Sequence, residues 1–228
     1  MKKEQKKKPV NWGKIAIIAF GVLFAVAMIG AYMMPLVSSF RPVRANESVA
    51  VDFTIRDDTG AVILTSVQQQ YANAYRSGGT PAYLARDPLV VVAGAPSDKV
   101  VESVQAYNPT TGWIQYAILS MEINDISQNI VGMRVGDTKT IPFTYSDPLQ
   151  MNISAEQYDF IGGNFTMVQV GDWIPLGFTD TPEIAASGDQ NVTPSSSLRL
   201  AEVINKSADN VTIKHRYGSV DVTIKKIS

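Results

Sequence analysis

The sequence contains no cysteine and only one histidine, His215. Without cysteine the chain can form no disulfide, thiolate nucleophile, iron–sulfur cluster or cysteine-ligated zinc site. A single histidine excludes a multi-histidine metal centre and argues against a Ser-His-Asp triad. No glycine-rich motif follows a strand in the manner of dinucleotide-binding or P-loop proteins. We therefore expect a protein that uses no cofactor and no metal.

Basic residues are scarce outside the first few residues of the chain. The 228 residues include 20 Lys and Arg against 21 Asp and Glu, but residues 1–14 hold six of the lysines and one of the acids. The remainder therefore carries 14 basic and 20 acidic side chains. Because nucleic-acid binding depends on neutralising phosphates with surplus Lys and Arg, we expect no nucleic-acid partner.

One long run, Ile15 to Val37, has no charged residue. As a helix it would extend roughly 34 Å, enough to cross a hydrocarbon core of about 30 Å. The lysines before it predict a cytoplasmic N-terminus. We therefore predict a cytoplasmic basic tail (1–14), a transmembrane signal-anchor helix (15–37) in contact with the lipid bilayer, and a tether (38–47). A cleaved signal peptide is the alternative, although its apolar core is usually only about 7–15 residues long.

This topology places the main domain outside the cell membrane, where Asn-x-Ser/Thr triplets can be glycosylated. Six such triplets follow the apolar run, and they begin at Asn46, Asn152, Asn164, Asn191, Asn205 and Asn210. We predict an exported, single-pass glycoprotein.

Alternation of apolar and polar residues predicts a hairpin of strands Ser48–Arg56 and Ala61–Ser66, joined by an Asp57-Asp58-Thr59-Gly60 turn. Further strands are expected at Pro88–Gly94 and Thr138–Tyr145. Helical spacing of apolar residues predicts a helix over Met121–Met133. Residues 67–87 are interpreted as a long loop, with one helical turn as the alternative within it, and residues 95–118 have no clear pattern.

The pattern changes after Pro148. Ser154 is a good N-cap for a short helix ending at Phe160. Residues 168–178 are expected to form strand, turn and strand, and residues 179–197 a Thr/Ser/Gly/Pro-rich loop. A hairpin of Leu198–Ile204 and Asn210–His215 and a last strand over Tyr217–Ile227 complete the chain.

The order of these segments resembles the FKBP family of peptidyl-prolyl isomerases. The first hairpin, the strand Pro88-Leu-Val-Val-Val-Ala-Gly94 and the stretch Ile130-Val-Gly-Met-Arg-Val-Gly-Asp137 carry the resemblance. Residues 148–215 are similar to the insert-in-flap domain of the SlyD-like subgroup. The resemblance implies an α+β fold, with a twisted antiparallel sheet wrapped on one short helix and a small inserted mainly-β domain. The FKBP-like domain would comprise 48–147 plus 216–228.

The resemblance also implies a catalytic pocket that twists an X-Pro amide without covalent chemistry. A dry pocket can favour the twisted amide over the planar ground state. The matching positions in this chain are Phe53, Ile63, Leu64, Leu89, Ile123, Ile126, Tyr145 and Val220. Leu64 stands where the family has an aspartate, and Leu149 competes with Tyr145 for the flap position.

Two functions follow from these features. The first is a membrane-anchored prolyl isomerase and folding chaperone, with unfolded or proline-containing polypeptides as partners. The second is a weak or inactive FKBP-fold module for binding or assembly in the cell envelope. Without the resemblance, Ile123, Ile126 and Ile130 are simply the buried face of a helix. Trp113, Trp173, Tyr158 and Phe160 are either core residues or a peptide-binding surface of the insert.

Overall fold

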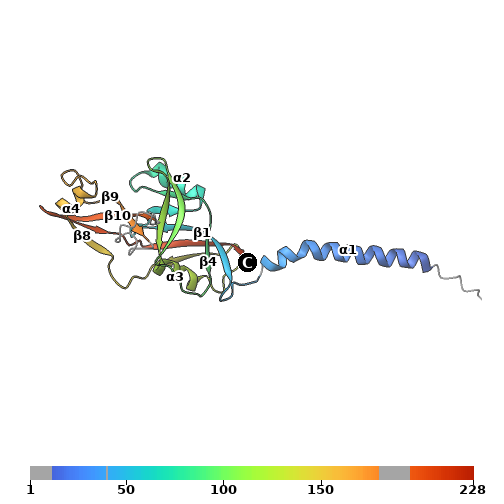
Figure 1. Ribbon diagram of the computed structural model, residues 1–228. Helices are drawn as coiled ribbons and strands as arrows, with labels where there is room; N and C mark the ends of the chain where they lie inside the picture. The colour runs from blue at the N-terminus through green and yellow to red at the C-terminus, as the bar shows by residue number, and fades with distance from the viewer. Residues whose placement is uncertain (1–11, 40, 180–195) are drawn as a thin grey trace, which may run out of the picture. The chain divides into compact units, whose positions relative to one another are not determined.

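The computed structural model describes residues 12–39, 41–179 and 196–228 and divides into two units, Met1–Arg41 and Pro42–Ser228 (Figure 1). Most of the basic tail, Phe40 of the tether and Asn191 with most of the 179–197 loop lie outside the described residues.

In the first unit, helix α1 runs from Trp12 to Ser39. The side chains described between Ile17 and Ile29 are exposed. A membrane crossing requires about 20 consecutive apolar residues in a helix. Among the described residues, no helix has both the length and the apolar character for a crossing. The predicted anchor over 15–37 and the single-pass membrane localisation are therefore not supported.

The second unit is built mainly of strands. They are β1 (Ser48–Arg56), β2 (Val62–Thr65), β3 (Tyr83–Ala85), β4 (Leu89–Val92), β5 (Val101–Asn108), β6 (Gly112–Leu119), β7 (Thr138–Pro142), β8 (Gln150–Ser154), β9 (Trp173–Thr179), β10 (Ser196–Lys206), β11 (Asn210–Lys214) and β12 (Ser219–Ile227). Three helices accompany them: α2 (Gln68–Ser77), α3 (Ser120–Asn129) and α4 (Ala155–Phe160).

These twelve described strands belong to one curled sheet. Ten follow a continuous path in the order β7-β12-β1-β2-β3-β5-β6-β10-β11-β8, while β4 pairs with β1 and β9 with β10. The pairs β2–β3 and β6–β10 are parallel. The predicted fold class, a small antiparallel FKBP-like sheet on one helix preceded by a transmembrane helix, is therefore wrong.

The observed sheet differs from the predicted one because of two segments for which no strand was predicted, residues 67–87 and 95–118. Residues 67–87 form α2 and β3 rather than a loop, and residues 101–119 form the β5–β6 hairpin. The β5–β6 hairpin extends the sheet beyond β3, and Tyr116 of β6 pairs with Leu198 of β10. Strand edges expose unpaired peptide groups that a further strand can pair with. Through such pairing, β3, β5 and β6 join the predicted FKBP-like part and the predicted insert into a single sheet.

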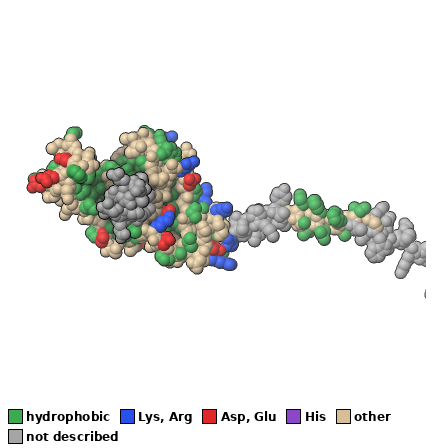
Figure 2. Space-filling model, in the orientation of Figure 1, with side chains coloured by type: hydrophobic (Ala, Val, Ile, Leu, Met, Phe, Trp, Pro, Cys, Tyr) green, Lys and Arg blue, Asp and Glu red, His purple; other side chains and the backbone are tan. Residues whose placement is uncertain are grey.

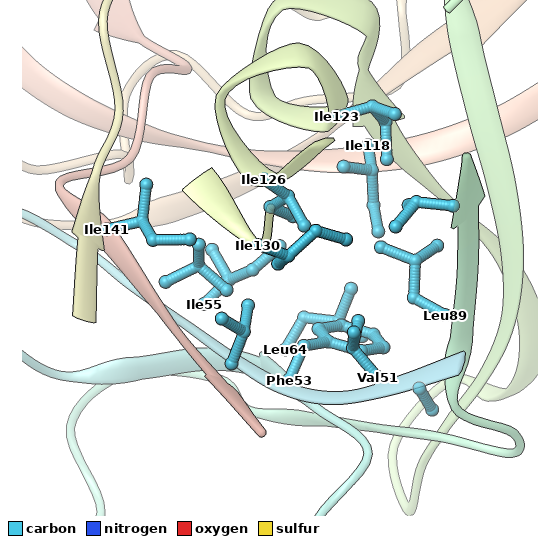
Figure 3. Close-up of a cluster of buried hydrophobic side chains, with 14 of the residues drawn as sticks. Val51, Phe53, Ile55, Leu64, Leu89, Ile118, Ile123, Ile126, Ile130 and Ile141 are labelled. Atoms are coloured by element: carbon cyan, nitrogen blue, oxygen red, sulfur yellow. The ribbon is translucent and has the colours of Figure 1, made fainter. Parts of the chain in front are cut away.

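Among the described residues, three groups of buried apolar side chains lie on this sheet, and the smallest comprises Val101, Ala117 and Leu119. The main core joins β1, β2, β4, β7 and β12 to α3, whose Ile123 and Ile126 pack toward the strands together with Ile130, which follows the helix (Figure 3). The second core comprises Ile153, Tyr158, Val168, Ile174, Ala201, Val203, Val211 and Ile213. It lies wholly within the predicted insert, 148–215. The division into separate domains stays a prediction, because the sheet runs through both parts.

Candidate functional site

The structure brings most of the predicted isomerase residues together, but as a packed cluster. Phe53, Leu64, Leu89 and Ile126 point toward one another between the strands and α3 (Figure 3). Seven of the eight predicted residues are buried in the main core: Phe53, Ile63, Leu64, Leu89, Ile123, Ile126 and Val220. In this conformation their side chains are in contact with the protein rather than with solvent. Their role as a substrate pocket stays a prediction.

Tyr145, the eighth predicted residue, lies outside this cluster. It follows β7 and packs beside Val101, Ala117 and Leu119. Its Oη donates a hydrogen bond of 2.5 Å to Oε1 of Glu122, and it accepts one of 3.0 Å from the backbone N–H of Tyr217. Tyr145 therefore connects the chain after β7 to α3 and to the entry of β12.

Glu122 and Arg199 form an ion pair that is fully buried. The guanidinium donates from Nη2 to Oε1 at 2.5 Å and from Nη1 to Oε2 at 3.0 Å. Its Nε donates to the carbonyl of His215 at 2.7 Å, and its carbon lies 4.0 Å from the ring centre of Tyr217. Such two-pronged pairing satisfies the donors of a buried guanidinium. The pair joins α3 to β10.

Burial and this charge pair shift the pKa values of neighbouring groups. Burial alone would lower the pKa of Arg199, but the adjacent Glu122 carboxylate raises it, so the guanidinium stays charged. Burial, and then the charge of Glu122, raises the pKa of Tyr145. Burial raises the pKa of Tyr217 to about 12, although the charge of Arg199 acts in the opposite direction. These phenols are thus neutral near pH 7, which suits donors of fixed hydrogen bonds rather than proton-transfer groups.

A different place in the molecule offers an open surface. Strands β8 and β9 and helix α4 enclose a groove of about 730 Å³, called here the apolar groove. Its lining residues are Met151, Asn152, Ile153, Glu156, Gln157, Phe160, Ile161, Leu176, Gly177 and Phe178. Glu156 is the one charged residue among these lining residues. The groove therefore favours apolar groups.

Local chemistry fixes the helix that forms one wall of the groove. The hydroxyl of Ser154 accepts a hydrogen bond from the backbone N–H of Gln157, and the Gln157 side chain accepts one from the N–H of Ser154. This reciprocal capping box starts α4 as the sequence predicts. The buried ring of Tyr158 holds the helix on the second core, while Phe160 lies at the C-terminal end.

Large apolar side chains around the groove face solvent. Phe160 is 92% exposed, Ile161 59% and Met151 50%. Figure 2 shows hydrophobic side chains on the part of the surface that carries β8 and α4, with acidic residues at its tip. Contiguous exposed apolar surface of this kind marks interaction sites in folded proteins.

The groove is also bordered by strand edges. β8 pairs with β11, and β9 pairs with β10. Among the described strands, neither β8 nor β9 has a partner on its other side. Unpaired N–H and C=O groups along such edges can form main-chain hydrogen bonds with an added extended segment. The groove thus combines apolar pockets with strand edges.

The sequence identified part of this surface. Phe160 was one of four aromatic candidates for peptide contact, and its exposure distinguishes it from Tyr158, which is buried. Met151 and Ile161 were missed, because in sequence they look like ordinary strand and helix-end residues. Their adjacency depends on the pairing of β8 with β11, which places Met151 opposite Ile213.

The glycosylation candidates are accessible where the structure describes them. Asn46, Asn152, Asn164, Asn205 and Asn210 are all exposed. Their modification stays a prediction.

Comparison with protein-family models finds no family that matches the chain, and comparison with curated proteins finds none that is similar to it. A functional hypothesis therefore rests on the geometry of the chain itself.

Proposed function

We propose that this protein binds other polypeptides by holding their exposed apolar segments in the apolar groove. The observation that carries the proposal is the nearly complete exposure of Phe160 beside Met151 and Ile161. Burying a side chain of this size is worth about 1.5–3 kcal/mol, and a bound segment would supply that burial. Unfolded chains are the class of partner that exposes such segments.

Three properties of the lining suit segments of varied sequence. The thioether of Met151 adapts to different shapes because methionine is unbranched and polarizable. The unpaired edges of β8 and β9 bind main-chain groups, which every sequence contains. The lining supplies little charge, so specificity for one acidic or basic motif is not expected.

Prolyl isomerase activity is the alternative. Seven of its eight expected residues are packed in the main core, so catalysis would require the cluster around Phe53 and Ile126 to open. Binding in the apolar groove needs no such opening, and we therefore favour a binding function without isomerisation.

The test compares two matched substitutions in the full chain. Phe160→Ser removes an exposed apolar side chain from the groove, and Val100→Ser removes one that is 68% exposed and lies outside it. Affinity for a permanently unfolded, fluorescently labelled polypeptide should fall about tenfold for Phe160→Ser and stay unchanged for Val100→Ser. Equal affinities of the two variants would contradict the proposal.

A protease-coupled assay with a short X-Pro peptide, run on the same samples, addresses the alternative. We expect no acceleration of isomerisation above the buffer rate. Clear acceleration that is unaffected by Phe160→Ser would favour the isomerase.

A further inference from the structure

A second cleft lies on the opposite side of β9 from the apolar groove. Alternate residues of a strand point to opposite faces, so Leu176 and Phe178 line the groove while Trp173 and Pro175 line this cleft. The cleft has a volume of about 460 Å³ and is called here the aromatic cleft. Its other walls come from the end of α2, the loop before β3, the β5–β6 turn and β10.

Aromatic and aliphatic surfaces form the floor and sides of the aromatic cleft. Tyr83 and Leu200 are buried at its base, and the Tyr83 ring contacts the ring of Tyr116 at 5.3 Å. Tyr116 Oη is hydrogen-bonded to Tyr217 Oη at 2.5 Å, so the floor rests on the buried network. Tyr75, which is 61% exposed, forms an outer wall. The exposed ring of Tyr75 and the half-buried ring of Trp173 thus lie beside a fixed base.

The polar groups of the cleft are of two kinds. The amide of Asn108 is engaged with the backbone: Nδ2 donates to the carbonyl of Ala82, and Oδ1 accepts from the N–H of Thr110, both at 2.8 Å. In the described part of the chain, no hydrogen bond engages the hydroxyls of Tyr75, Thr80 and Thr110. The ligand would therefore meet hydroxyl donors and ring faces.

The absence of charged residues from the described lining of the cleft restricts the class of ligand that it can bind. None of the described residues that line the cleft is charged, so phosphate, carboxylate and ammonium groups have no counter-charge there. Neutral sugars usually require planar polar side chains for their paired hydroxyls, and the Asn108 amide is already engaged. The lining instead complements a neutral ligand with apolar rings and free carbonyl acceptors.

We propose that the aromatic cleft binds a proline-rich polypeptide segment in the polyproline II conformation. Such a segment carries no charge, presents pyrrolidine rings that pack on Tyr and Trp faces, and leaves its backbone carbonyls free to accept hydrogen bonds. The conformation exists before binding, so little entropy is lost on docking in a small cleft. This site goes beyond the proposed function and does not depend on it.

The test uses an uncharged, labelled decaproline peptide and the full chain, with binding followed by fluorescence anisotropy. We expect saturable binding with a Kd below about 1 mM. Tyr75→Ala, which removes an exposed ring, and Thr110→Arg, which places a bulky charge at the exposed rim, should each weaken binding about tenfold. Phe160→Ser in the apolar groove should leave it unchanged, which separates this site from the proposed function.

Two cleft variants are used so that the test still works if one of them misfolds. Thermal melts verify that each variant is folded. Absence of saturable decaproline binding, or binding unaffected by both cleft variants, would overturn the proposal. Equal binding of a Gly/Ser decapeptide would also overturn it, because that peptide lacks the rings. Binding of cellohexaose that is lost in Tyr75→Ala and Thr110→Arg, without binding of decaproline, would assign the cleft to a neutral glycan instead.

Discussion

At the scale of single residues, the buried Glu122–Arg199 pair links α3 to β10 in the interior of the protein. Removing one partner of such a pair leaves an uncompensated charge in the interior. We expect Arg199→Leu to lower the free energy of unfolding by about 3–5 kcal/mol, measured by urea denaturation of the full chain. The double variant Glu122→Leu/Arg199→Leu should recover most of this loss, because neither charge remains. Equal destabilisation of the single and double variants would show that packing, not charge, dominates here.

His215 gives the protein a pH dependence at the same scale. Burial, and then the charge of Arg199, lowers the pKa of His215, whose buried Nδ1 has no hydrogen-bond partner among the described residues and whose ring lies against Phe178. On acidification the unfolded chain therefore takes up the proton first, near its ordinary pKa of about 6.5, and the folded state loses stability.

We expect the free energy of unfolding to decrease as the pH falls from about 7 to 5.5. His215→Gln, which cannot titrate, should reduce this decrease, and urea melts of the two proteins at each pH measure it. An identical slope in both proteins would assign the pH dependence to other groups.

At the scale of elements, residue patterns correctly predicted the strands and helices that are determined by residues close together in the sequence. β1 coincides with the predicted strand Ser48–Arg56, and α4 begins at the Ser154 cap. The hairpin of β10 and β11 is also confirmed, within two residues at each end. Alternation and capping are properties of neighbouring residues, so they can be recognised in the sequence without knowledge of the fold.

Elements determined by distant partners could not be read in this way. β5 has the sequence Val-Glu-Ser-Val-Gln-Ala-Tyr-Asn and no strict alternation, and it becomes a strand through pairing with β6 and β3. Likewise, residues 168–172 contain a turn at 170–171 and no strand, where a strand was predicted. The candidate groove depends on the curvature that brings β8, α4 and β9 together, which no local pattern encodes.

The turn into β12 offers a test of element packing. A Cβ at Gly218 would lie 2.7 Å from the carbonyl oxygen of Asp57, a backbone atom that cannot move freely. We expect Gly218→Ala to destabilise the fold by roughly 1–3 kcal/mol. Gly177→Ala, where no atom of the described residues beyond its two chain neighbours lies within 4 Å of the new Cβ, is the matched control and should change the melting temperature little. Similar melts for the two variants would contradict the packing at this turn.

At the scale of the whole molecule, the two candidate functions, prolyl isomerisation and polypeptide binding, depend on different residues, which are buried in one case and exposed in the other. All the residues expected to form an isomerase pocket except Tyr145 are buried in the main core, and the open apolar surface lies around the second core. The sequence favoured the isomerase pocket because the order of its segments resembles a known family. Whether neighbouring side chains fill the space of that pocket depends on the three-dimensional packing, which the sequence pattern does not show.

Hydrogen exchange of the full chain, with and without a permanently unfolded polypeptide, tests binding in the apolar groove. We predict slower exchange of backbone amides in β8 and β9, residues 150–154 and 173–179, because an added segment would cover these strand edges and exclude water. Amides of β1 and α3 should be unaffected. Protection confined to β1, β2 and α3, or unchanged exchange in β8 and β9 at saturating polypeptide, would contradict binding in the apolar groove.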